Sequence, residues 1–238
     1  MTAHGASRRK LGTGFGLEAE MAEPVARWMR RRGLSVKKEF AVPWGVCDLV
    51  GARLDFANVK RRLLYGQIQP VGSLLRLMIL SRIPETASGR SKSLLRLRKD
   101  FSPQLSPDQL SAEVEILLRR KFLVSTRTGF FQRRNGWAPL HRSIVAVELK
   151  LERIPEAVGQ AASNRAFATE SYVALPGWLA MQVSRGRRAE EFGRNGVGLL
   201  AVWRHGCREL IKPASTEALC NEIVQSHVVE RFWRTRDS

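Results

Sequence analysis

Cysteine and histidine are scarce in this sequence, and their scarcity limits the sites that it can build. The three cysteines are Cys47, Cys207 and Cys220. Their odd number and their lack of CxxC spacing argue against a disulfide framework and against a zinc ribbon. The four histidines are scattered along the chain, so a histidine-based metal site is not expected either.

Long apolar runs are absent too. The longest apolar stretch, residues 71–79, is interrupted by Arg76 and is too short to span a bilayer. Residues 1–16 contain Gly, Ser and Arg without an apolar core, so we do not expect them to be a secretory signal. We expect residues 1–16 to be a flexible tail, and we expect a cytoplasmic protein without a membrane partner.

Acidic residues are too few to balance the basic ones. The chain has 22 acidic residues against 40 lysines and arginines, a formal net charge of +18 and a pI near 11.1. Such a charge implies a polyanionic partner, and nucleic acid is the first candidate because phosphate neutralisation supplies affinity for any base sequence. Arginine greatly outnumbers lysine, which suits bidentate phosphate contacts but is equally expected from a coding bias.

An alternating apolar run at residues 144–151 ends with two opposite charges. Residues two apart on a strand share a face, so Glu148 and Lys150 point together, whereas the alternate residues point into a core: Val145, Val147, Leu149 and Leu151. The pairing makes chemical sense if Glu148 holds a divalent cation and Lys150 orients or polarises a water for attack on a phosphodiester. The spacing alone is weak evidence, because an acid-x-Lys triplet is expected about once by chance in such a chain.

Two further acids lie in patterned segments near the N-terminus. Residues 17–32 read as a helix, and Glu18 lies on its apolar stripe as either a partner of the helix dipole or part of a site. Residues 35–41 and 46–54 are predicted strands around a Pro-Trp-Gly turn. Asp48 is flanked by apolar residues in the second strand, which is rare unless the carboxylate is paired or bound to a metal.

Residues 59–135 have a different character, with sixteen basic and five acidic residues. Helical patterns occur at residues 73–81, 91–99 and 108–121, and two β-like runs follow around a Thr-Gly turn at residues 122–134. Helices followed by such a hairpin are typical of a winged helix-turn-helix. We therefore expect an inserted, mainly helical, winged-helix-like domain; a basic helical cap on the core is the alternative.

Alternating strands and helices return after the insert. The expected elements are a helix with Gln160 at residues 155–169, strands at 172–175, 196–204 and 208–211, an Arg-rich loop at 184–195, and a final helix at 215–232. We expect residues 17–58 and 136–238 to form one α/β core, in which a mixed central sheet is flanked by helices.

The helix with Glu18, the strand with Asp48, the strand with Glu148-x-Lys150 and the helix with Gln160 together resemble the PD-(D/E)XK phosphodiesterase superfamily, the restriction-endonuclease-like nucleases. The resemblance covers the first 55 residues and about 140–212, without the basic insert. It implies that Asp48, Glu148 and the carbonyl of Leu149 ligate Mg²⁺ or Mn²⁺. The other implied roles belong to Lys150 beside the attacking water, Gln160 near the substrate phosphate or the water network, and Glu18 as a supporting or second-metal acid.

Two departures from the family pattern stand out. Cys47 directly precedes Asp48 where the family has proline, and the insert separates the two acids by an unusual length. A structural ion pair between Glu148 and Lys150 is the alternative to a nuclease site.

The leading hypothesis is a Mg²⁺-dependent endonuclease that acts on DNA in preference to RNA. A non-catalytic DNA-binding regulator and an RNA-directed nuclease are the alternatives, because phosphate contacts are common to DNA and RNA. A homodimer or a partner protein is also considered, since one such site cuts one strand. The basic residues expected at the nucleic acid are Arg119, Arg120, Lys121, Arg127, Arg133, Arg134, Arg185, Arg187 and Arg188.

Overall fold

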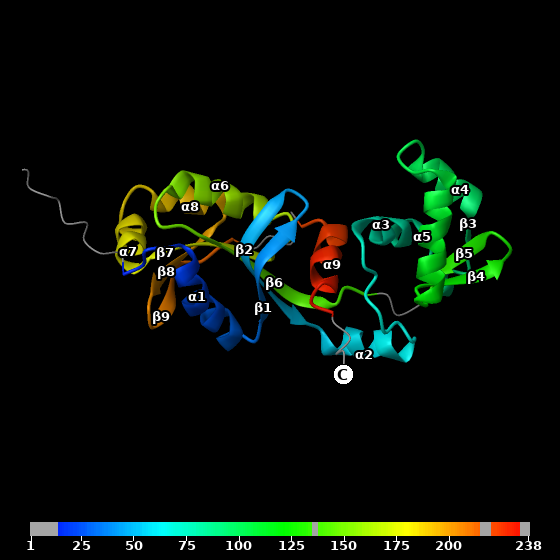
Figure 1. Ribbon diagram of the computed structural model, residues 1–238, viewed down its shortest axis with the longest axis horizontal. Helices are drawn as coiled ribbons and strands as arrows, with labels where there is room; N and C mark the ends of the chain where they lie inside the picture. Colours follow the sequence, from blue (N-terminus) through cyan, green and yellow to red (C-terminus); the bar gives the residue numbers. More distant parts are fainter. Residues whose placement is uncertain (1–13, 135–137, 215–219, 234–238) are drawn as a thin grey trace, which may run out of the picture. The chain divides into compact units, whose positions relative to one another are not determined.

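The computed structural model describes residues 14–134, 138–214 and 220–233 (Figure 1). The chain divides into two compact units: unit 1 consists of Met1–Gly51 and Ile144–Leu219, and unit 2 of Ala52–Ser143 and Cys220–Ser238. The C-terminal segment, which the sequence pattern assigns to the α/β core, therefore belongs to unit 2. Of the expected N-terminal tail, residues 1–13 lie outside the described residues.

The expected α/β core contains a six-stranded sheet. The strands lie in the order β1 (Ser35–Val42), β2 (Gly45–Leu54), β6 (His141–Leu149), β7 (Glu170–Pro176), β8 (Gly198–Trp203) and β9 (Gly206–Ile211). Strand β7 runs parallel to both β6 and β8, whereas β9 is antiparallel to β8. The sheet is thus mixed, as the sequence predicts, and β2 and β6 are neighbours within it.

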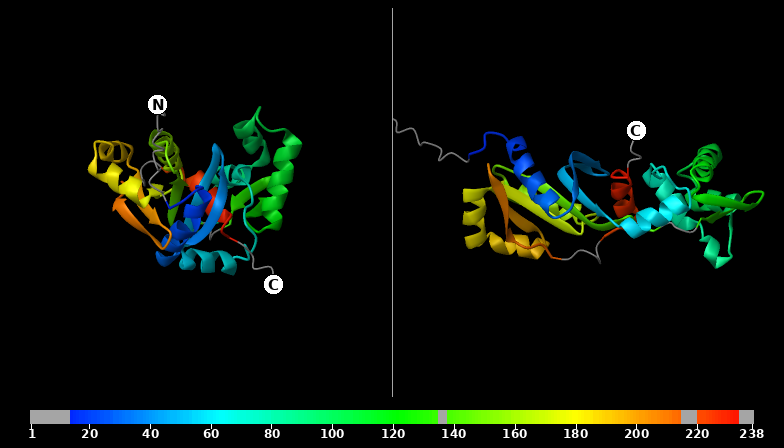
Figure 2. Two further views of the ribbon diagram at one scale, coloured as in Figure 1. Left: turned by 60° about the vertical axis from the view of Figure 1, so that its left-hand side comes forward. Right: turned by 90° about the horizontal axis from the view of Figure 1, so that it is seen from below.

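Helices cover both faces of this sheet (Figures 1 and 2). Helix α1 (Ala19–Arg31) packs on one face, and α6 (Ile154–Asn164), α7 (Gly177–Arg185) and α8 (Ala189–Asn195) pack on the other. Consecutive residues of β7 alternate between the faces, because Tyr172 is buried in the α1 cluster and Val173 in the α6 cluster. The expected α/β fold with a mixed central sheet between helices is confirmed.

Two expected elements differ from the structure. The Arg-rich segment 184–195 was expected to be a loop, but it contains α8. Phe192 of this helix is fully buried and packs it onto the core, which the basic composition of the segment does not indicate. The final helix, expected at 215–232, is α9 (Glu222–Glu230). Residues 215–219 of that prediction lie outside the described residues.

Unit 2 consists of short helices and a three-stranded antiparallel sheet. Its elements are α2 (Phe56–Leu64), α3 (Leu74–Arg82), a 3-10 turn (Thr86–Ser88), β3 (Lys92–Ser93), α4 (Leu94–Phe101), α5 (Pro107–Arg119), β4 (Leu123–Arg127), β5 (Phe130–Arg133) and α9. The strands lie in the order β3-β5-β4. Helix α5 begins at a capping box between Ser106 and Gln109, which satisfies the free N–H groups at its start. No helix in the described ranges is long and apolar enough to cross a membrane.

A buried ion pair ties α9 to the rest of unit 2. Arg62 of α2 is 0% exposed and Glu230 is 3% exposed, and their side chains meet at 2.5 Å and 3.1 Å. The same carboxylate accepts the N–H of Val71 at 2.8 Å. The guanidinium of Arg62 also lies over the rings of Phe122 and Trp233. Because both charges are removed from water, each depends on the other.

Glu230→Ala should lower the free energy of unfolding by about 3–5 kcal/mol, because it leaves the Arg62 charge buried without its carboxylate. Glu23→Ala is the matched control, since Glu23 pairs with Arg30 at 2.9 Å but is 52% exposed. Its replacement should cost about 0–1 kcal/mol. Urea denaturation followed by circular dichroism measures the free energy of unfolding of both variants. Equal losses would contradict a special role of the buried Arg62–Glu230 pair.

Candidate active site

Two neighbouring strands bring Asp48 and Glu148 together, although 100 positions separate them in the chain. Asp48 is on β2 and Glu148 is on β6. The N–H of Leu149 donates to Asp48 Oδ2 at 2.7 Å, which fixes the aspartate beside the end of β6. The two carboxyl groups interact with each other, and each influences the pKa of its neighbour.

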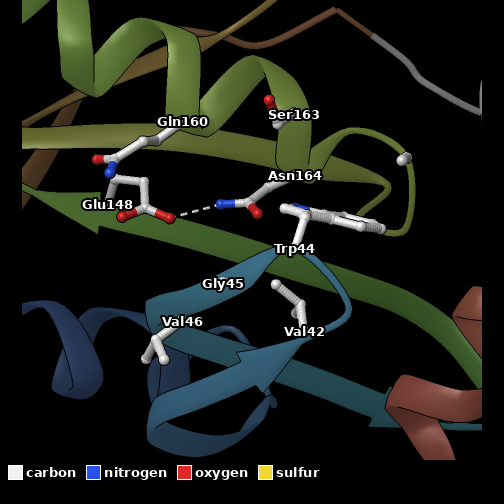
Figure 3. Close-up of a pocket in the computed structure, with 9 residues that line it drawn as sticks. Val42, Trp44, Gly45, Val46, Glu148, Gln160, Ser163 and Asn164 are labelled. Atoms are coloured by element: carbon white, nitrogen blue, oxygen red, sulfur yellow. Dashed lines mark hydrogen bonds between the residues drawn. The ribbon is translucent and has the colours of Figure 1, made fainter.

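Helix α6 holds Glu148 in place. The amide Nδ2 of Asn164 donates to Glu148 Oε1 at 2.6 Å (Figure 3). Glu148 is only 4% exposed and Asn164 is 3% exposed, so this bond is well protected from water. The thiol of Cys47 lies in the same place, 3.5 Å from Asn164 Nδ2. Cys47 is therefore a buried neighbour of the acids.

The environment opposes the charged forms of both acids. Burial raises the pKa of Glu148, and the nearby Asp48 charge raises it further. Burial also raises the pKa of Asp48, against the lowering effects of the Leu149 N–H and of Lys150. Two carboxylates held together out of water favour binding a proton or a cation between them.

Lys150 lies just beyond the end of β6, and its ammonium favours the charged form of both acids. Its Nζ is 3.7 Å from Glu18 Oε2. Glu18 precedes α1 and accepts the N–H of Leu151 at 3.3 Å. Glu148 is thus held by Asn164 of α6, whereas Lys150 contacts Glu18 at the start of α1. The end of β6 therefore contacts both helices through these two side chains.

Gln160 lines a hollow beside Glu148, as does Asn164. The hollow has a volume of 460 Å³. Its lining is supplied by the β1–β2 hairpin, by Glu148 and by the C-terminal half of α6 with the residues after it: Val42, Trp44, Gly45, Val46, Glu148, Gln160, Ser163, Asn164 and Ala166. Figure 3 shows Gln160 and Asn164 on α6, with the Trp44 ring of the hairpin turn beside Asn164. The sequence pattern did not reveal Trp44 as a site residue, because its only signal was its place in a tight turn.

The donor set of this site fits a hard cation. Within the described ranges, no three side chains of His, Cys, Asp or Glu are grouped as metal ligands. The pair of Asp48 and Glu148 therefore leaves the remaining positions to main-chain oxygen, water or substrate. Mg²⁺ is commonly bound by one or two carboxylates together with substrate phosphates. A divalent cation there would also favour the charged forms of both carboxylates, which burial disfavours.

The basic residues that were expected to contact nucleic acid fall into two groups in the structure, exposed ones and ones bonded within unit 2. Exposed side chains belong to Arg119, Lys121, Arg127, Arg185, Arg187 and Arg188. Three others hold unit 2 together: Arg120 donates to the carbonyl of Pro70 at 2.7 Å, Arg133 pairs with Glu85 at 2.7 Å, and Arg134 donates to the carbonyl of Tyr65 at 3.4 Å. The guanidinium groups of Arg120 and Arg133 are thus already engaged within their own unit.

A second basic cluster was not predicted from the sequence. Arg82, Arg90, Arg96 and Lys99 are exposed around a hollow of 450 Å³ in unit 2, where Lys92 pairs with Asp100. The count of basic residues located this charge in the insert. It could not show that α3, α4 and the segment between them bring these four side chains to one surface.

Comparison of the chain with protein-family models, with curated protein sequences and with solved structures gave no match.

Glu148→Gln should raise the free energy of unfolding of the metal-free protein at neutral pH, because Gln keeps the acceptor for Asn164 without burying a charge. The pKa of Glu148 is raised in the folded protein. The protonated Glu148 carboxyl therefore stabilises the folded protein fully at a pH below its pKa in the unfolded chain. This stabilisation is lost as the pH rises through its pKa in the folded protein. The gain from Glu148→Gln should accordingly be small in acid and grow toward neutral pH.

Chemical denaturation in EDTA between about pH 4 and pH 8 measures this difference. The control is Glu190→Gln, because Glu190 is exposed on α8 and its replacement should change stability little. A gain independent of pH would contradict the buried charge as its cause.

Proposed function

We propose that the chain is a Mg²⁺- or Mn²⁺-dependent endonuclease that hydrolyses phosphodiester bonds in DNA, with a core of the PD-(D/E)XK type. The observation that carries this proposal is the pair of Asp48 and Glu148 on adjacent strands, with raised pKa values and Lys150 beside them. The mixed sheet between helices supports it, because that is the architecture the family resemblance implies.

Each side chain of the site has a role in this proposal. Asp48 and Glu148 hold the cation together with the carbonyl of Leu149, and Asn164 keeps the Glu148 carboxylate oriented. When bound, the cation polarises the phosphoryl oxygen and favours ionisation of the attacking water. Lys150 positions that water, and Glu18 holds the Lys150 ammonium at 3.7 Å. Gln160 faces the substrate from α6.

Unit 2 is the proposed DNA-holding module, of winged-helix-like type. Its order of α3, β3, α4, α5, β4 and β5, with the strands arranged β3-β5-β4, supports this proposal. In a helix-turn-helix the second helix enters the major groove, and here that helix is α5. Helix α5 exposes the acids Asp108 and Glu115 and has Arg119 at its end. The charge pattern therefore favours phosphate contacts through the cluster of Arg82, Arg90, Arg96 and Lys99.

A non-catalytic DNA-binding regulator is the second candidate function. It is favoured by the lack of a third grouped metal-ligating side chain in the part of the chain that the structure describes. An RNA-directed nuclease differs from the main proposal only in its substrate, because phosphate contacts do not distinguish RNA from DNA.

Asp48→Asn, Glu148→Gln and Lys150→Met should each reduce Mg²⁺-dependent cleavage of plasmid DNA at least about 100-fold, and EDTA should stop cleavage by the parent. Each variant should keep the parent's circular dichroism spectrum and its DNA affinity. Glu156→Gln is the control, because Glu156 is an exposed acid of the same helix as Gln160. A Glu148→Gln protein that cuts at the parent's rate would overturn the assignment, and a parent that binds DNA but never cuts would favour the regulator.

Neutralising Arg82, Arg90, Arg96 and Lys99 to Gln should weaken DNA binding and flatten its salt dependence. The log-log slope on duplex DNA should decrease by about 0.9 for each phosphate that the protein no longer neutralises. Neutralising the exposed residues Arg119, Lys121 and Arg127 serves as the comparison set, with both effects expressed per charge removed. If the comparison set decreased the slope more, the DNA-binding surface would lie at the β4–β5 hairpin and the end of α5. If neither set changed the slope, unit 2 would not bind DNA through these residues.

A further inference from the structure

The hollow beside Glu148 is lined by groups unsuited to phosphate. Its nine lining residues include no lysine or arginine, in a chain that has 40 of them. Among the described residues, the Glu148 carboxylate is the only charged group on this wall, and it repels a phosphate. A neutral ligand is therefore expected in this hollow, although it lies next to the proposed phosphodiester site.

One wall of the hollow is apolar and unusually exposed. Trp44 is 45% exposed and Val46 is 60% exposed, and both belong to the β1–β2 hairpin. The ring of Trp44 is supported by Phe167, with their centroids 6.0 Å apart and their planes tilted by 41°. An indole supported in this way and open to solvent is suited to stacking against a flat ligand.

A second part of the lining is polar and uncharged. Gln160, Ser163 and Asn164 line it from α6 and its end (Figure 3). Asn164 Nδ2 is used by Glu148. The Ser163 hydroxyl donates to the carbonyl of Gly159, which leaves its oxygen available as an acceptor. The Gln160 amide is exposed. Amide and hydroxyl groups in this position match the hydrogen-bonding edge of a nucleobase.

We propose that this hollow holds one unpaired nucleobase of the substrate, stacked on Trp44, next to the phosphodiester that the site cuts. A base within a duplex has both faces covered by its neighbours, so it reaches an indole only when it leaves the stack or lies in a single strand. The nuclease thus acts at single-stranded or locally unpaired positions. The choice of substrate rests on the proposed function, whereas the binding of the base does not require cleavage.

Binding to fluorescently labelled DNA in EDTA tests the proposal without any cleavage. Trp44→Ala should weaken binding of a single-stranded oligonucleotide by about 5- to 150-fold, the range for removal of one base–aromatic stack. Trp44→Phe keeps an aromatic face and should bind within about threefold of the parent. Trp178→Ala is the matched control, because Trp178 is 49% exposed on α7 and does not line this hollow. Its affinity should be unchanged.

A fully paired duplex separates base stacking from backbone contact. Trp44→Ala should leave affinity for a blunt duplex unchanged, and it should weaken binding again when the duplex carries an unpaired loop. The circular dichroism spectrum of Trp44→Ala should match that of the parent, which checks that the hairpin still folds. Equal weakening on single strand and duplex, or no weakening on either, would overturn the base assignment.

The outcomes also separate this inference from the nuclease proposal. A parent that binds single strands through Trp44 in EDTA but cuts nothing with Mg²⁺ supports the base site and removes the nuclease. A parent that cuts duplex and single-stranded DNA equally, with no change on Trp44→Ala, keeps the nuclease and removes the base site.

Discussion

The confinement of Asp48 and Glu148 in one buried place is the constraint on which unit 1 depends. Two carboxylates with raised pKa values remain there only because their surroundings supply compensating groups. The Leu149 N–H bonds Asp48, Asn164 bonds Glu148, and the Lys150 ammonium lies near both. Leu149 ends β6, Lys150 follows it directly, and Asn164 ends α6. The order of the strands and the packing of α6 on the sheet are therefore both needed to assemble these partners.

Such an arrangement is costly when nothing is bound, because burial disfavours both charges. Structures tend to keep costly charge where function needs it, and a divalent cation would convert the repulsion into binding energy. The neighbouring hollow has the opposite character, with an exposed indole and no basic group on its wall. In the proposed function, the two acids serve the phosphate of a nucleotide, and the uncharged part of the hollow around Trp44 serves its base.

Unit 2 uses its charges in two different ways. Arg62 and Glu230 are buried and hold α9 to the unit, and Arg120 and Arg133 bond to groups of the same unit. Arg82, Arg90, Arg96 and Lys99 are instead exposed around one hollow. Net charge therefore overstates the number of cations that can meet phosphate, and burial decides which of them are accessible.

Local patterning determined much of this protein from the sequence alone. Period-two alternation identified β6, and two apolar runs around a Pro-Trp-Gly turn identified β1 and β2. Helical periodicity identified α1, α5 and α6, and acids among apolar strand residues drew attention to Asp48 and Glu148. These features depend only on near neighbours in the chain, which is why they can be read directly. The tertiary structure alone decided that Asn164 bonds Glu148, that Glu18 meets Lys150, that Trp44 walls the hollow and that α9 belongs to unit 2. Each of these contacts joins segments distant in sequence, and a periodic pattern shows which face of a segment is buried but not what covers it.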